Sequence, residues 1–106
     1  MNDLNEWLEQ QNGGIRTYAE FQQVAYNLAR ETPENAAILV LLGNVAARFA
    51  ARFKGEPFSV DEASSAILEF KGILKTAADV ISGPESEKLC FANRIATFDL
   101  LETKNP

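Results

Sequence analysis

The feature that most constrains the fold is a long apolar stretch near the middle of the chain, residues 33–54, with the sequence PENAAILVLLGNVAARFAARFK. Between Ala36 and Gly43 it carries no polar side chain, and it is rich in Ala and Leu, which favour helices. A helix that is apolar nearly all round is a buried helix. We therefore expect residues 33–54 to form a central helix that the rest of the chain covers.

This central helix has two distinct apolar faces when its residues are placed at about 3.6 per turn. One face carries large side chains and should lie in the core: Ile38, Leu42, Val45, Phe49 and Phe53. The other face is small, and Gly43 with Ala47 should let a neighbouring helix approach closely. At the two ends, Thr32 is placed to cap the helix and Gly55 to stop it.

A membrane span is the alternative interpretation of such a stretch. A span needs about 20 consecutive apolar residues. The apolar run here reaches only from Ala36 to Ala47, and Asn44 interrupts it. The length therefore favours the core helix of a soluble protein.

The rest of the chain has helical periodicity and no alternation typical of strands. Capping-box spacing occurs at Thr17 with Glu20 and at Ser59 with Glu62, each before an apolar run. A length of 106 residues is the size of one domain. We predict a single all-α domain over residues 1–106, a bundle of four longer helices plus a short N-terminal helix, with a polar tail at 103–106. The expected helices cover residues 3–11, 18–31, 33–54, 60–82 and 85–102.

Charge and cysteine content limit the partners and the compartment. Ten basic and fifteen acidic residues give a net charge of −5, which disfavours nucleic acid and anionic membrane surfaces but suits a basic protein partner. The single cysteine, Cys90, allows no internal disulfide and is expected to be an ordinary, partly buried thiol. The N-terminus lacks the pattern of a signal peptide. These features predict a cytoplasmic protein.

The absence of histidine removes most catalytic and metal-binding arrangements from consideration. It excludes histidine-activated nucleophiles and histidine-ligated zinc or iron sites. Carboxylates at helical spacing, such as Glu6 with Glu9, could in principle hold magnesium, but they face away from the apolar side and are expected to lie in solvent. We predict no catalytic residue, no metal site and no cofactor.

Two arginines are candidates for binding an anion. Arg48 and Arg52 lie one turn apart on the narrow polar stripe of the central helix. Such a pair can hold a phosphate or a carboxylate, and it can equally pair with acids on a neighbouring helix or lie in solvent.

The last predicted helix has two apolar faces, although one is enough to dock it. The face expected to dock it comprises Leu89, Ala92, Ala96 and Leu100, which leaves Phe91, Ile95 and Phe98 surplus. Either the first helix covers this second face through Trp7, or the face forms a dimer or partner interface. In the second case Asp99 and Glu102 would lie at its rim. Tyr26, on the polar side of the second helix, is a further interface candidate.

Three functional hypotheses from different classes remain. The first is a non-enzymatic protein-binding module: an adaptor, a small chaperone, or an inhibitor of the immunity-protein or phage anti-defence type. Its partner would be another protein with a basic surface, or a second copy of the chain. The second is a small-molecule sensor or carrier with an apolar pocket between helices. The third, a carboxylate-metal nucleotide hydrolase, has the least support. Function must be argued from sites, and the missing catalytic pattern favours the first hypothesis.

Overall fold

The computed structural model describes residues 2–11, 15–53 and 59–101, and it confirms the predicted all-α bundle. No strand occurs among these residues. The elements, in chain order, are α1 (Asn2–Glu9), α2 (Ile15–Glu31), the single 3-10 turn η1 (Pro33–Asn35), α3 (Ala36–Arg52), α4 (Val60–Ile81) and α5 (Glu85–Ala96). The predicted stop at Gly55 and the tail at 103–106 lie outside the described residues.

Local capping explains where some helices begin and corrects two expectations. The predicted capping box before α4 is present: the Glu62 N–H donates to Ser59 Oγ at 3.0 Å, and the Ser59 N–H donates to Glu62 Oε1 at 3.2 Å. The other predicted box is wrong, because α2 begins at Ile15 and Thr17 lies inside it, buried. Thr32 makes no side-chain capping bond either, and the central helix begins with the 3-10 turn η1.

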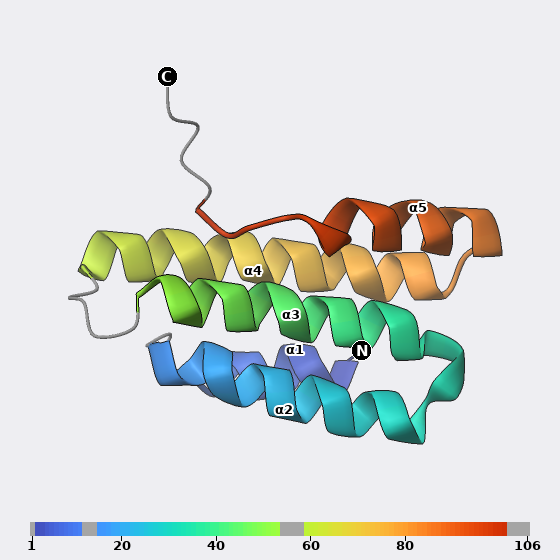
Figure 1. Cartoon of the computed structure of the whole chain (residues 1–106), viewed down its shortest axis with the longest axis horizontal. Coiled ribbons are helices and arrows are strands. Elements are labelled where there is room, and N and C mark those ends of the chain that lie inside the picture. Colours follow the sequence, from blue (N-terminus) through green and yellow to red (C-terminus); the bar gives the residue numbers. More distant parts are fainter. Residues whose placement is uncertain (1, 12–14, 54–58, 102–106) are drawn as a thin grey trace.

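Helices α2 and α3 form an antiparallel pair, and α1 and α5 join this pair to α4 (Figure 1). The α2–α3 pair makes the most extensive contact in the fold. Helix α5 packs on both α3 and α4, and α1 packs on both α2 and α4. The two shorter helices therefore connect the α2–α3 pair to α4 from different sides.

The centre of the bundle is an aromatic cluster in which α2, α3 and α4 meet. The Tyr18 ring lies 4.7 Å from that of Phe49 and 5.6 Å from that of Phe70, and Phe21 lies 4.7 Å from Phe70, all between ring centroids. Edge-on and tilted pairs at these separations are favourable beyond the area they bury. Leu42 and Phe49 are buried as predicted for the large face of the central helix.

The small face of α3 meets α2 closely, as the sequence predicts. Gly43 is buried, and a Cβ placed on it would lie 3.2 Å from Tyr26 Cε1. The Tyr26 hydroxyl donates to Asn44 Oδ1 at 2.6 Å and accepts from Gln22 Nε2 at 3.0 Å. Tyr26 is half-buried within this helix pair. Its hydroxyl ties α2 to α3, and its place in a partner interface stays a prediction.

The expected orientation of α5 is wrong. Phe91 and Ile95, predicted to be surplus, are only 4% exposed and dock the helix, whereas Leu89 is 64% exposed. The expected cover is also different, because Phe91 and Ile95 lie on the helix that packs against α3 and α4, while Trp7 of α1 packs against Phe21. The apolar pattern predicts one helix over residues 85–102, but α5 ends at Ala96.

One stretch of the described chain, Pro33–Arg52, is long and apolar enough to cross a membrane by length and composition. The core helix of a soluble protein meets the same criterion. In this fold Leu42 and Phe49 of the stretch are buried against other helices. The structure is therefore compatible with a soluble protein.

Candidate functional site

The chain beyond α5 forms a short non-helical segment, residues 97–101, which we call the strap. It follows the end of α5 at Ala96 and crosses to residues on α3 and α4 (Figure 1). Leu100 is its main anchor, since its side chain is completely buried. Leu101, the last described residue, has a φ of 52°, a left-handed conformation that a bulky side chain rarely adopts.

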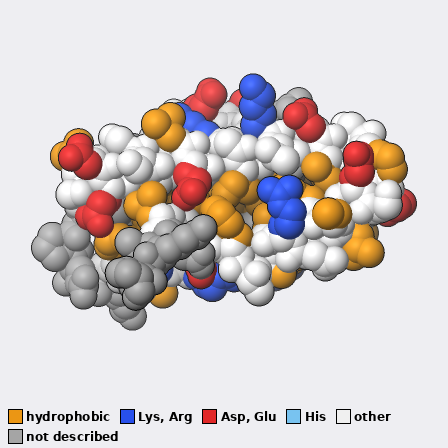
Figure 2. Space-filling view, turned by 90° about the horizontal axis from the view of Figure 1, so that it is seen from above, with side chains coloured by type: hydrophobic (Ala, Val, Ile, Leu, Met, Phe, Trp, Pro, Cys, Tyr) orange, Lys and Arg blue, Asp and Glu red, His pale blue; other side chains and the backbone are white. Residues whose placement is uncertain are grey.

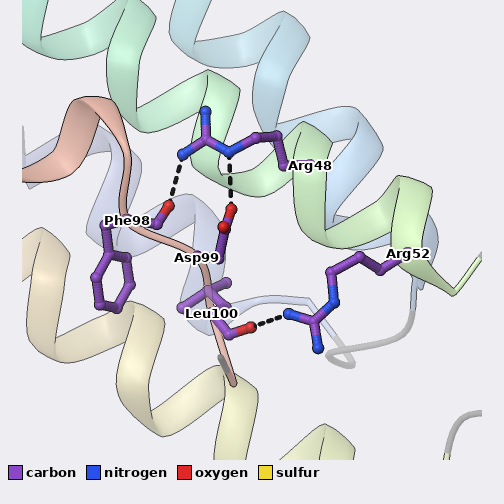
Figure 3. A network of polar contacts seen from close by, with 5 residues as sticks. All are labelled: Arg48, Arg52, Phe98, Asp99 and Leu100. Atoms are coloured by element: carbon purple, nitrogen blue, oxygen red, sulfur yellow. Dashed lines mark hydrogen bonds and ion pairs between the residues drawn. The ribbon is translucent and has the colours of Figure 1, made fainter. Parts of the chain in front are cut away.

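Two arginines of α3 hold the strap (Figure 3). Arg48 Nε donates to Asp99 Oδ1 at 2.8 Å, and its Nη2 donates to the Phe98 carbonyl at 2.5 Å. Arg52 Nη1 donates to the Leu100 carbonyl at 2.5 Å, and its Nη2 donates to the Leu101 carbonyl at 3.2 Å. The pair considered for binding an anion therefore binds one carboxylate of the chain itself and three main-chain carbonyls.

Helix α4 supplies the remaining polar contact to the strap, from Glu69. Its Oε1 accepts the Leu101 N–H at 2.9 Å. These polar groups lie near solvent: the Arg48 and Asp99 side chains are 38% and 36% exposed. Ion pairs this exposed contribute about 0–1 kcal/mol, whereas burying a leucine contributes about 1.5–3 kcal/mol. The Leu100 side chain thus dominates the attachment of the strap.

Beside the strap, a groove of about 430 Å³ runs between α4 and α5. We refer to it as the groove, and the described residues that line it are Glu69, Gly72, Ile73, Thr76, Phe91, Arg94, Ile95 and Phe98. Phe98 and Glu69 belong to both the groove and the strap contacts. Seen from above α4 and α5, apolar side chains gather in the middle of this face with charged side chains beside them (Figure 2).

A second hollow of about 320 Å³ continues the groove and shares Thr76, Phe91 and Arg94 with it. Cys90 lines this hollow and is exposed, which corrects the expectation of a partly buried thiol. Asp79 and Glu87 line it as well. The described lining of the two hollows therefore holds three carboxylates, Glu69, Asp79 and Glu87, and one guanidinium, that of Arg94.

Among the described residues, one titratable group has a strongly shifted pKa, and it lies away from these surfaces, in the core. Burial raises the pKa of the Tyr18 hydroxyl to about 12. Among the residues that the structure describes, no partner accepts or donates a hydrogen bond to this buried hydroxyl. Tyr18 is packed between Phe49 and Phe70, so it is a feature of the core. In the described ranges, no group of three or more acidic or cysteine side chains is placed to hold a metal ion.

The structure brings together some of the residues that the sequence singled out and separates others. Phe98 and Asp99 meet Arg48 at the strap, and Phe91 and Ile95 form the groove. Tyr26 lies in the α2–α3 pair, and Glu102 falls outside the described residues. Five residues of the groove are not singled out by the sequence analysis: Glu69, Gly72, Ile73, Thr76 and Arg94.

One of the missed residues has a sequence pattern that could have marked it. Gly72 lies in the middle of a 22-residue helix, where a glycine weakens the helix by about 1 kcal/mol relative to alanine. In the structure Gly72 is exposed and a Cβ there would meet nothing within 4 Å. Packing therefore does not require a glycine here. Because Gly72 has no side chain, nothing extends from this position over the groove.

Comparison of the chain with models of known protein families, with curated proteins and with solved structures finds no match.

Proposed function

We propose that the chain is a non-enzymatic protein-binding module whose contact surface is the groove between α4 and α5. The observation that carries the proposal is an open groove whose floor is apolar, with Phe91 and Ile95 in it, and whose edges are charged. An adaptor, a small chaperone and an inhibitor would all act through such a contact. We also propose, from the sequence pattern, that it works in the cytoplasm.

The chemistry of the groove favours a partner segment that is amphipathic and basic. Grooves between helices receive the apolar face of a partner helix, which places anchors at one-turn intervals. The described edges carry three carboxylates and one guanidinium, and the whole chain has a net charge of −5. A basic residue beside the apolar anchors would pair with Asp79 or Glu87. Such pairing speeds the encounter of the two proteins and fixes their orientation more than it raises the affinity.

The proposal is tested by blocking the groove without disturbing the core. Gly72→Arg places a long side chain over the groove from a position with open space. Ser64→Arg is the matched control, because Ser64 is exposed on the same helix, lies outside the groove lining and acquires the same charge. Host proteins captured by the immobilised chain and by both variants would be quantified by mass spectrometry. We expect a protein retained by the wild type and by Ser64→Arg and reduced at least tenfold with Gly72→Arg. Equal capture by all three would refute the groove as the contact surface.

The volume of the groove supports a second candidate function, the binding of an apolar small molecule. Ligand pockets in proteins occupy about 300–1,000 Å³, and the groove, at about 430 Å³, lies within this range. An environment-sensitive dye attached to Cys90, the only cysteine, would report occupancy of the adjoining hollow. A response to small apolar compounds that Gly72→Arg abolishes, without any captured protein, would favour this second function.

A further inference from the structure

The strap is bound in the manner of a peptide ligand. Three of its carbonyls and one of its N–H groups are satisfied by side chains of other helices. Main-chain contacts of this kind do not depend on which side chains the bound segment carries. Two side chains supply the selectivity: Asp99, which pairs with Arg48, and Leu100, which is completely buried. We call the surface formed by Arg48, Arg52 and Glu69, with the pocket for Leu100, the strap seat.

Several observations make the strap exchangeable. Its polar contacts are made by groups near solvent: Arg52 and Glu69 are exposed, and the Arg48–Asp99 pair is more than a third exposed. Leu101 holds a left-handed conformation that is unfavourable for leucine, and it is fixed there by Arg52 and Glu69. Strained backbone of this kind persists only where its surroundings impose it, and it is common at binding and switch sites.

We propose that the strap seat is a recognition site for a short non-helical segment of a partner protein, one that carries an acidic side chain followed by a leucine. The chain's own strap occupies the seat until such a segment replaces it. The inference rests on the proposed protein-binding function and deepens it, because Phe98 and Glu69 border both the seat and the groove. A segment that displaced the strap would therefore run directly into the groove.

A partner protein fits the seat better than a second copy of the chain does. The described strap has five residues, 97–101, whereas a stable interface uses about 20–30 residues on each side. A foreign segment can continue into the groove and so reach a larger contact. The positive charge of Arg48 complements its acidic side chain in the way that it already complements Asp99.

The test uses a fluorescein-labelled peptide with the strap sequence TFDLL and the full-length chain. In the wild type the tethered strap competes with the peptide, so the measured binding is weak. Leu100→Ala removes the strap's main anchor, and we expect the peptide to bind this variant at least tenfold more tightly. Where circular dichroism shows that Leu100→Ala does not fold, Asp99→Ala, at a partly exposed position, provides the weakened strap instead.

Two controls separate recognition from loose hydrophobic binding. A peptide with Asp replaced by Asn should bind the weakened-strap variant several-fold less tightly, and adding Arg48→Gln should abolish that preference. Gly72→Arg blocks the groove but not the seat, so peptide binding should survive it while protein capture is lost. Failure of the peptide to bind any folded weakened-strap variant at millimolar concentration would overturn the seat and leave the groove proposal standing. A dimer that forms with rising concentration of the wild type, measured by light scattering, would overturn it in favour of exchange between copies.

Discussion

Two helical glycines in different environments predict opposite effects on stability. At Gly72 a Cβ would meet nothing within 4 Å, so Gly72→Ala changes only the helix propensity. Alanine is better than glycine inside a helix by about 0.8–1 kcal/mol, and we expect Gly72→Ala to raise the free energy of unfolding by about 0.5–1 kcal/mol. At Gly43 a Cβ would lie 3.2 Å from Tyr26 Cε1 and 3.4 Å from Ala25 Cβ.

The Tyr26 ring cannot easily move away from a new side chain at Gly43. Its hydroxyl is held at 2.6 Å by Asn44 and at 3.0 Å by Gln22. Gly43→Leu therefore overpacks the α2–α3 contact, which costs about 1–3 kcal/mol. The gain in helix propensity offsets about 1 kcal/mol of this. We expect a net loss of up to about 2 kcal/mol.

Urea denaturation followed by the helical circular dichroism signal measures both variants under the same conditions. Fluorescence of Trp7, the only tryptophan, gives a second probe, since its ring lies 6.0 Å from Phe21 of α2. Coincident transitions from the two probes justify a two-state analysis. The reasoning fails if Gly43→Leu is as stable as the wild type while Gly72→Ala shows its expected gain, because the α2–α3 contact would then be loose.

Three further predictions concern the core and the helix start. Leu42→Ala should lower the free energy of unfolding by about 2–5 kcal/mol, measured by urea denaturation, and a loss below about 1 kcal/mol would contradict its place in the core. Ser59→Ala should cost about 0.5–2 kcal/mol by removing the α4 capping box, and a double variant with Glu62→Ala should show that the two losses are not additive. Tyr18→Phe should be neutral or stabilising by about 1 kcal/mol at pH 7, because the buried hydroxyl lacks a partner among the described residues, whereas Tyr26→Phe should destabilise. Burial raises the pKa of Tyr18 to about 12 from 10.0. The contribution of this shift to the free energy of unfolding is therefore constant below pH 10 and is lost as the pH rises toward 12, by up to about 2–3 kcal/mol. Tyr18→Phe should remove this loss of stability in alkaline denaturation.

The sequence predicted the parts of the fold that depend on local pattern and on strongly apolar faces. The central helix, the α4 capping box and the small face at Gly43 are all present. Each of these features follows from residues that are close together in the sequence: a continuous apolar run, a Ser with a Glu three positions later, or a glycine among small side chains. The same reasoning failed for Thr17, because the residues before it were also able to enter the helix and α2 begins at Ile15.

The error in α5 has a single physical origin, the position at which the helix ends. With a helix assumed to residue 102, Leu89, Ala92, Ala96 and Leu100 form one face and appear sufficient for docking. The helix ends at Ala96, so Leu100 reaches the core from the strap and not from a helical face. Phe91 and Ile95 are then required for docking, and Leu89 is left exposed. Neither a glycine nor a proline marks this helix end, and Thr97 is a weak stop.

The arginines of α3 show why the candidate site could be recognised only in part. Arg48 and Arg52 were identified as a pair able to bind an acid, and Arg48 does bind one, but that acid lies 51 positions along the chain. A guanidinium group carries five donors in a fixed plane, so it can serve a carboxylate and a carbonyl together, as Arg48 does. Helical spacing reveals the donors but not whether a distant main-chain segment lies within reach. It follows that releasing the strap would leave Arg48 and Arg52 without the carboxylate and the carbonyls that they bind, on a chain whose net charge is −5. In the proposed function, the strap thereby determines the charge of the surface that a partner meets.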